Sequence, residues 1–112
     1  MRPPADGPGP RPGAYCRSLA GSDRGRLYLI RELVPGGHGT GNYLYLVDGS
    51  RHPWLRPKRK NLRHVRILSE ELDPDLWAWC LREKDTKQID GRLRRRLEEQ
   101  EKDFMKNEER GS

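Results

Sequence analysis

The sequence predicts a mainly β protein with an α-helical tail, in which a small five-stranded antiparallel barrel is followed by two helices. Residues 14–68 hold five short apolar or aromatic runs separated by turns rich in glycine, proline and aspartate, as in small all-β domains. Residues 74–97 instead repeat apolar residues at helical spacing. Because hydrophobic residues make up only 32% of the 112 residues, we expect a compact unit of roughly 60–70 residues with solvated flanks.

Composition divides the chain into three regions. Residues 1–13 are predicted to be a disordered leader, because eight of them are proline or glycine, which disfavour helices and central strands. The barrel is assigned to residues 14–70. Residues 71–112 are assigned to a helical extension, and we expect its mostly charged end to fray.

Two apolar runs, residues 15–19 and 27–34, predict the first two strands of the barrel. Between them lies a polar turn bounded by Gly21 and Gly25, where a tight backbone suits glycine. The third run, residues 43–47, is aromatic and aliphatic, which favours β structure.

The second half of the barrel is predicted from its turns. Asp48-Gly49 predicts a hairpin turn, because glycine tolerates the positive φ that such turns require. Residues 50–55 are then expected to pair back as a fourth strand, short or at an edge because the run contains a proline. Residues 57–60 are expected to form a basic loop, and residues 62–68 the fifth strand.

Capping residues mark the two helices. Asp73 suits the N-cap of the first helix and Pro74 its first helical position. The apolar stripe of this helix consists of Leu76, Trp77, Cys80 and Leu81. Asp85 is expected to cap the second helix. The apolar stripe of the second helix consists of Ile89, Leu93 and Leu97.

The net charge of +6 is concentrated in the predicted barrel. Residues 15–66 contain eleven cations and three acids, whereas residues 67–112 contain ten cations and thirteen acids. Residues 51–66 alone hold seven cations and two histidines without any acid. Positive charge this dense, with no neighbouring carboxylate to neutralise it, indicates a surface that binds a polyanion. A solvated charged face is the alternative interpretation.

Residues 14–26, which contain the turn Gly-Ser-Asp-Arg-Gly-Arg, resemble the start of a KOW motif. Together with Asp48-Gly49 and residues 56–64, they make the chain similar to the bacterial KOW-domain RNA-binding proteins. These are related to the KOW-type large-subunit ribosomal proteins of archaea and eukaryotes. The resemblance covers residues 15–68. It implies an SH3-like barrel that binds structured RNA, ribosomal RNA in particular, with ribosomal proteins as further partners.

The resemblance implies RNA-binding roles for basic residues in the matching segments. Phosphates need cations at loop tips, and arginine either grips a phosphate or stacks on a base. The implied RNA-binding residues are Arg24, Arg26, Arg56, Lys58, Arg59, Lys60, Arg63 and His64. The predicted structural turn residues are Gly21, Gly25, Asp48 and Gly49. The leader and the long glycine-rich loop at residues 35–41 depart from the family pattern, so that loop takes no role from it.

Several side chains allow two interpretations. Trp54 either stacks on a base or packs in the barrel, and packing is favoured. Trp79 either contacts the barrel or is exposed for an interaction. Asp23 either orients a neighbouring arginine or holds the turn, and the turn is favoured. The three histidines are expected to be solvated or to contact phosphate rather than to act as proton switches.

The sequence offers no pattern for catalysis, for a cofactor or for a metal. The GGHGTG run lacks the Lys-Ser/Thr ending of a phosphate-binding loop, and the cysteines and histidines lack metal-ligand spacing. No apolar stretch suits a signal peptide or a membrane span, so a cytoplasmic protein is expected. The first hypothesis is a non-catalytic RNA-binding protein. The alternatives are an adaptor of the translation or transcription machinery, which would use the barrel and the tryptophan-containing helix, and a binder of duplex DNA.

Overall fold

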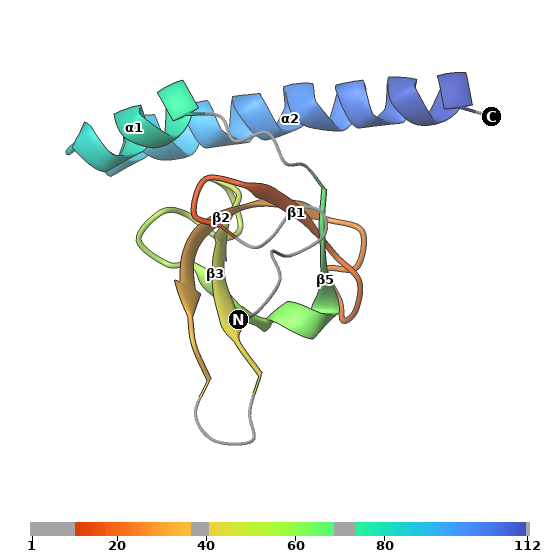
Figure 1. Cartoon of the computed structure of the whole chain (residues 1–112). Helices are drawn as coiled ribbons and strands as arrows, with labels where there is room; N and C mark the ends of the chain where they lie inside the picture. Colours follow the sequence, from red (N-terminus) through yellow and green to blue (C-terminus); the bar gives the residue numbers. More distant parts are fainter. Residues whose placement is uncertain (1–10, 37–40, 69–73, 112) are drawn as a thin grey trace, which may run out of the picture.

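The computed structural model describes the backbone of residues 11–36, 41–68 and 74–111, and the side chains of these ranges as far as residue 102. Its elements in chain order are β1 (Tyr15–Ser18), β2 (Leu27–Val34), β3 (Tyr43–Val47), β4 (Lys58–Asn61), the 3-10 turn η1 (Leu62–His64), β5 (Val65–Ile67), α1 (Pro74–Arg82) and α2 (Thr86–Gly111). The prediction of a mainly β fold with two C-terminal helices is confirmed (Figure 1). Asp73 and residues 1–10 of the predicted leader lie outside the described residues.

The five strands form one antiparallel sheet in the order β4-β3-β2-β1-β5. The sheet curls into a small barrel-like body beneath the helices (Figure 1). In the described chain the edge strands β4 and β5 are joined by η1 and are not paired with each other, so the sheet is not closed. The register of β2 shifts between Ile30 and Glu32, and beyond this irregularity β2 and β3 extend away from the helices (Figure 1).

The strands β1 and β2 are buried on both faces, so the sheet lies between two apolar cores. Cys16, Tyr28 and Ile30 face the inside of the barrel, where they pack with residues of β3 and β5. Their neighbours Tyr15 and Leu29 face the opposite way and pack beneath the helices. Because both faces are apolar, the helical layer is part of the folded core rather than an appendage.

The helices cover this second face with the residues that the helical spacing predicted. Ile89, Leu93 and Leu97 of α2 are all buried. The Asp85 carboxylate accepts a hydrogen bond from the Lys87 backbone at 3.0 Å, as expected of an N-cap. The backbone of α2 is helical as far as Gly111, across the segment in which we expected fraying.

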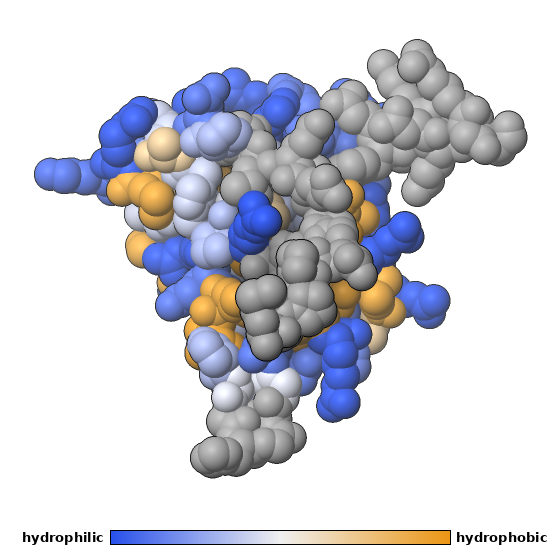
Figure 2. Space-filling model, viewed as in Figure 1, coloured by the Kyte–Doolittle hydropathy of each residue, from blue (hydrophilic) through white to orange (hydrophobic). Residues whose placement is uncertain are grey.

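The apolar stripe of α1 needs one correction. Leu76 and Cys80 are buried, but Leu81 is 63% exposed because it lies just outside the face that meets the sheet. Hydrophilic side chains line the outer side of the helices in the view of Figure 2. Within the described residues, neither helix combines the length and the apolar character needed to cross a membrane.

The predicted fourth strand at residues 50–55 is wrong, and the predicted basic loop is in fact β4. The Asp48 carboxylate accepts hydrogen bonds from the backbone of Ser50 and His52, each at 2.9 Å. The Asp90 carboxylate of α2 accepts from the Trp54 backbone at 2.7 Å. Side chains thus take the backbone donors that a strand would need, so the chain stays irregular and pairs with β3 only from Lys58 onward. The predicted fifth strand likewise begins with η1 and becomes extended at Val65.

Candidate nucleic-acid interface

A buried polar network fixes the turn between β1 and β2. The Asp23 carboxylate accepts hydrogen bonds from the Ser18 hydroxyl at 2.9 Å and from the Tyr28 hydroxyl at 2.8 Å. Lys60 of β4 donates to the same carboxylate at 2.7 Å and to the Ala20 carbonyl at 2.9 Å. The Lys60 side chain is only 10% exposed and is already paired. Lys60 is therefore a structural residue, and its assignment to RNA binding is corrected.

The network shifts the ionisation of its members. Burial alone would raise the pKa of Asp23, but the hydrogen bonds from Lys60, Tyr28 and Ser18 and the Lys60 charge outweigh burial and hold that pKa well below its usual range. Burial, together with the hydrogen bond to Asp23, raises the pKa of Tyr28. Asp23 therefore remains ionised and holds the turn, which is the favoured one of its two predicted roles.

The predicted turn residues all lie in turns. Gly21, Gly25 and Gly49 have φ angles of +87°, +88° and +80°, a region that favours glycine. Asp48 accepts the two backbone hydrogen bonds described above, and its side chain is only 6% exposed.

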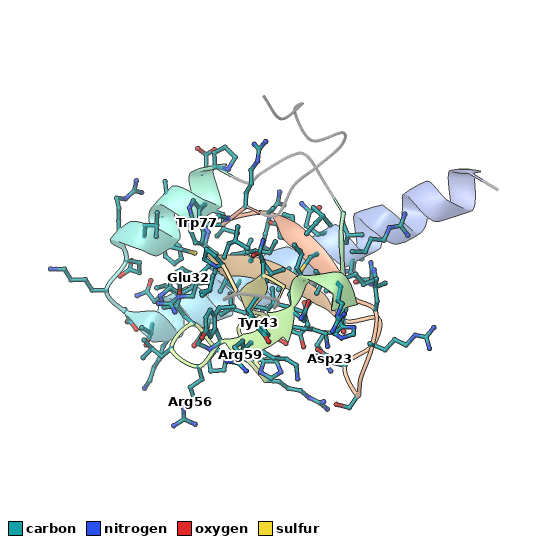
Figure 3. All side chains as sticks on the ribbon, turned by 60° about the horizontal axis from the view of Figure 1, so that its bottom comes forward. Asp23, Glu32, Tyr43, Arg56, Arg59 and Trp77 are labelled. Atoms are coloured by element: carbon teal, nitrogen blue, oxygen red, sulfur yellow. The ribbon has the colours of Figure 1, made fainter. Side chains whose placement is uncertain are left out.

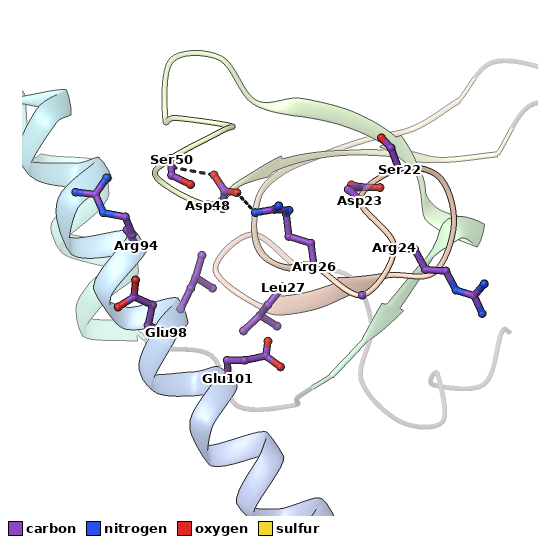
Figure 4. Close-up of a pocket in the computed structure, with 12 residues that line it drawn as sticks. Ser22, Asp23, Arg24, Arg26, Leu27, Asp48, Ser50, Arg94, Glu98 and Glu101 are labelled. Carbon is purple, nitrogen blue, oxygen red and sulfur yellow. Dashed lines mark hydrogen bonds and ion pairs between the residues drawn. The ribbon is translucent and has the colours of Figure 1, made fainter.

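Arg24 and Arg26 line a surface groove of about 440 Å3 between the β1–β2 turn, the loop after β3, and α2 (Figure 4). The charged residues that line it are Arg24, Arg26 and Arg94, and Asp23, Asp48, Glu98 and Glu101. The Arg26 guanidinium lies 3.6 Å from Asp48 Oδ2, a buried oxygen with no hydrogen-bond partner in the described chain. Because acids outnumber cations here and Arg26 already compensates Asp48, the groove is a poor phosphate site. Arg24 is the more exposed of the two turn arginines.

The remaining predicted RNA-binding residues lie along one continuous stretch of chain; they are Arg56, Lys58, Arg59, Arg63 and His64. Arg66, which was not predicted as a site residue, continues this stretch, and we call the six residues the basic segment. All of these except the half-buried Lys58 are exposed, and within the described residues none forms an ion pair with a carboxylate. Figure 3 shows Arg56 and Arg59 on the side of the barrel that carries β4.

The local fold presents the basic segment rigidly. The Asn61 side chain accepts a hydrogen bond from the Arg63 backbone at 3.0 Å and so caps η1. The Leu19 backbone donates to the His64 carbonyl at 2.8 Å, which ties the other end of η1 to β1. The turn η1, held at both ends, lies at the end of the barrel away from the helices (Figure 1), and its residues Arg63 and His64 are exposed.

Two aromatic residues beside the basic segment were missed as site residues by the sequence analysis. Tyr43 and Tyr45 of β3 were predicted only as strand residues, yet both are half-buried on the outer face of the sheet. The Arg59 guanidinium lies 4.6 Å from the centre of the Tyr43 ring. The spacing of the two tyrosines, with an apolar residue between them, was the signal that could have identified an outer aromatic face.

The three tryptophans support the fold instead. Trp54 is 8% exposed and lies in the core beneath the helices, 5.8 Å from Trp77 between ring centres. Arg31 covers the Trp54 ring at 4.7 Å, so packing, not stacking on a base, is the role of Trp54. Trp79 packs partly against the same core and is covered by Arg92 at 4.6 Å.

Other side chains that could be nucleophiles, proton carriers or metal ligands are buried or lie apart from one another. Burial raises the pKa of the Cys16 thiol to about 12, which keeps it protonated and unreactive. Burial lowers the pKa of His52, although the nearby Asp48 charge opposes this. In the parts of the chain that the structure describes, no three histidine, cysteine, aspartate or glutamate residues gather as metal ligands.

The site is therefore defined by geometry: the basic segment, which runs from the loop before β4 through β4 and η1 to β5, beside two tyrosines on β3. Lys60 and Arg26 are set apart from it by their ion pairs. Searches with models of protein families and against curated proteins found no match to this chain.

Proposed function

We propose that this protein is a non-catalytic RNA-binding protein of the KOW type, which docks on structured RNA through the basic segment. One observation carries the proposal. The cations that stabilise the fold are paired with carboxylates, as Lys60 is with Asp23 and Arg17 is with Glu101 at 3.0 Å. The cations of the basic segment have no such pairing among the described residues.

Arginines that lie on or near a turn held at both ends, and that have no carboxylate partner among the described residues, suit a phosphate backbone. Each phosphate contact releases counterions, so the binding free energy comes largely from the solvent and needs no deep pocket. A turn held at both ends loses little conformational entropy on binding. The resemblance to bacterial KOW-domain RNA-binding proteins, which are related to KOW-type ribosomal proteins, makes ribosomal RNA the proposed target and the cytoplasm the proposed location.

The test measures binding of a ribosomal RNA fragment over a salt series. The test variant replaces Arg56, Arg59 and Arg63 with glutamine. If these residues contact three phosphates, the slope of log affinity against log salt should become shallower by roughly 2–3 units, and affinity should fall at least about 10-fold.

The matched control removes the same number of charges from the helical tail, at and between the facing ends of α1 and α2. It replaces Arg82, Lys84 and Lys87, all exposed, with glutamine. It should keep nearly the original affinity and salt slope if the RNA is bound by the basic segment. Equal losses in the two variants would refute the proposal, because they would show a response to net charge alone.

An adaptor that binds protein through α1 is the alternative. Its two tryptophans are half-buried, and Trp79 is covered by Arg92, so Leu81 is the large apolar side chain that α1 exposes. A single exposed leucine is ordinary for a protein surface. The structure therefore offers stronger support for the basic segment as the binding surface.

A further inference from the structure

The outer face of the sheet beyond the helices carries an ordered row of side chains. The register places Glu32 of β2 opposite Tyr45 of β3, and Tyr45 opposite Arg59 of β4. Paired residues in neighbouring strands share one face of the sheet. Leu44 and Leu46 belong to the core inside the barrel, so this row faces outward.

Tyr43 and Tyr45 are not explained by the fold. Neither residue belongs to the core inside the barrel or to the core beneath the helices. Both are only half-buried, although a tyrosine in the middle of a sheet usually packs beneath another layer. The helices lie over the other end of the sheet, and beyond them β2 and β3 extend away (Figure 1).

Arg59 joins this face to the basic segment. Its guanidinium lies 4.6 Å from the centre of the Tyr43 ring, and its side chain is exposed. Figure 3 shows Arg59 next to Tyr43, with Arg56 nearby. A planar guanidinium held on an aromatic ring leaves its other plane open, and bases stack on such planes.

Glu32, at the β2 end of the row, favours a base over a phosphate as the ligand of this face. Glu32 is exposed and flanks Tyr45 on the side opposite Arg59. A carboxylate repels a phosphate but accepts hydrogen bonds from the N–H groups on the edge of a base. The face therefore suits a base better than it suits the phosphate backbone.

We propose that Tyr43, Tyr45 and Arg59 form a stacking platform for an unpaired RNA base, with Glu32 accepting hydrogen bonds from its edge. This inference rests on the proposed function and adds the class of RNA: a loop or a bulge rather than an uninterrupted duplex. Phosphates flanking the unpaired base would then reach the basic segment through Arg56 and its neighbours.

The probe is an RNA hairpin whose loop carries 2-aminopurine, compared with a duplex made of the same stem. Stacking quenches 2-aminopurine fluorescence, so the wild-type protein should quench the loop signal and should prefer the hairpin to the duplex. Tyr45→Leu should abolish the quenching and lower hairpin affinity about 10-fold, since stacking on one aromatic ring is worth on the order of a 10-fold change in affinity.

A second pair of variants keeps the positive charge and tests whether the planar guanidinium of Arg59 is needed for stacking. Arg59→Lys should lower hairpin affinity severalfold while leaving the salt slope and the duplex affinity unchanged. Arg82→Lys is the matched control, because Arg82 is exposed at the end of α1, outside both the basic segment and the tyrosine row, and it should change neither affinity. Circular dichroism of each variant verifies folding, and the lysine pair decides the question if Tyr45→Leu does not fold.

The outcomes separate the two proposals. Salt-dependent binding of hairpin and duplex with equal affinity, without quenching, would overturn the platform and leave the proposed RNA binding intact. Equal effects of the two lysine variants would also overturn it. Absence of salt-dependent binding to either RNA would overturn the proposed function itself. Glu32→Gln should raise affinity for the duplex slightly, because a negative charge is lost, but should reduce discrimination among bases in the loop.

Discussion

Replacing Gly49 with alanine should destabilise the protein more than the same change at Gly25, and the difference measures how closely α2 packs on the loop after β3. Gly49 has a φ of +80°, and an added Cβ would lie 2.2 Å from the Asp90 carbonyl oxygen and 2.9 Å from the Arg94 nitrogen, both in the α2 backbone. Gly25 has a φ of +88°, but an added Cβ would meet nothing within 4 Å. The two sites share a positive φ and differ in their neighbours.

The expected magnitudes follow from that difference. A Cβ in the left-handed region costs about 1–2 kcal/mol, so Gly25→Ala should lower the free energy of unfolding by that amount. At Gly49 the helix backbone must also move, and overpacking of this kind costs typically about 1–3 kcal/mol. Gly49→Ala should therefore cost roughly 2–5 kcal/mol in all.

Urea unfolding followed by tryptophan fluorescence and circular dichroism gives both values. Gly91→Ala serves as a control with an expected effect of the opposite sign. Gly91 lies inside α2, has no positive φ and has nothing within 4 Å of an added Cβ. The variant should stabilise the protein by about 0.5–1 kcal/mol. If Gly49→Ala and Gly25→Ala destabilise equally, the loop does not contact α2 in solution, and the reasoning fails.

Two further predictions concern stability and pH. Asp23→Asn removes the charge that Lys60 neutralises in a nearly buried position, so the free energy of unfolding at neutral pH should fall by about 3 kcal/mol. Folding lowers the pKa of Asp23, so the contribution of its carboxylate to the free energy of unfolding is complete above its unfolded pKa of about 4. That contribution is lost as pH falls through the folded pKa. The urea midpoints of wild type and variant should therefore converge in acid. Folding also lowers the pKa of His52, so the stability that the neutral ring contributes is complete above about pH 6.5 and is lost as pH falls through the folded value. A His52→Gln variant should lack this loss, and parallel pH profiles of unfolding would contradict the assignment.

The sequence predicted the parts of the fold whose signals are local. The apolar runs of the early strands and the spacing of Ile89, Leu93 and Leu97 depend on neighbours within a few residues, and both predictions are confirmed. The fourth strand was misplaced in part because one of the acceptors that occupy its backbone donors is Asp90, 36 residues away from Trp54. No pattern within residues 50–55 indicates that the Asp90 carboxylate accepts this hydrogen bond.

The candidate site, too, was predictable only where its signal is local. Density of charge identified the basic segment, but it could not separate Arg59 from Lys60, which are adjacent in sequence. The alternation of β4 does separate them: Lys60 pairs opposite Leu44 on the inner face, and Arg59 pairs opposite Tyr45 on the outer face. Because residues 57–60 were predicted as a loop, the alternation of side chains along a strand was not applied to them, and this alternation would have placed Lys60 in the interior.

The helices do more than cover the sheet, because they also fix the chain that leads into the basic segment. The Asp90 carboxylate holds the Trp54 backbone at 2.7 Å, and the Arg94 side chain donates to the Gly49 carbonyl at 3.3 Å. Both contacts hold the loop between β3 and β4, and the basic segment begins two residues after Trp54, at Arg56. A loop tied to a helix that packs on the sheet has little freedom to move, so Arg56 is held in a fixed place beside Arg59. In the proposed RNA binding, the helical tail would therefore act indirectly, by positioning a surface that it does not itself form.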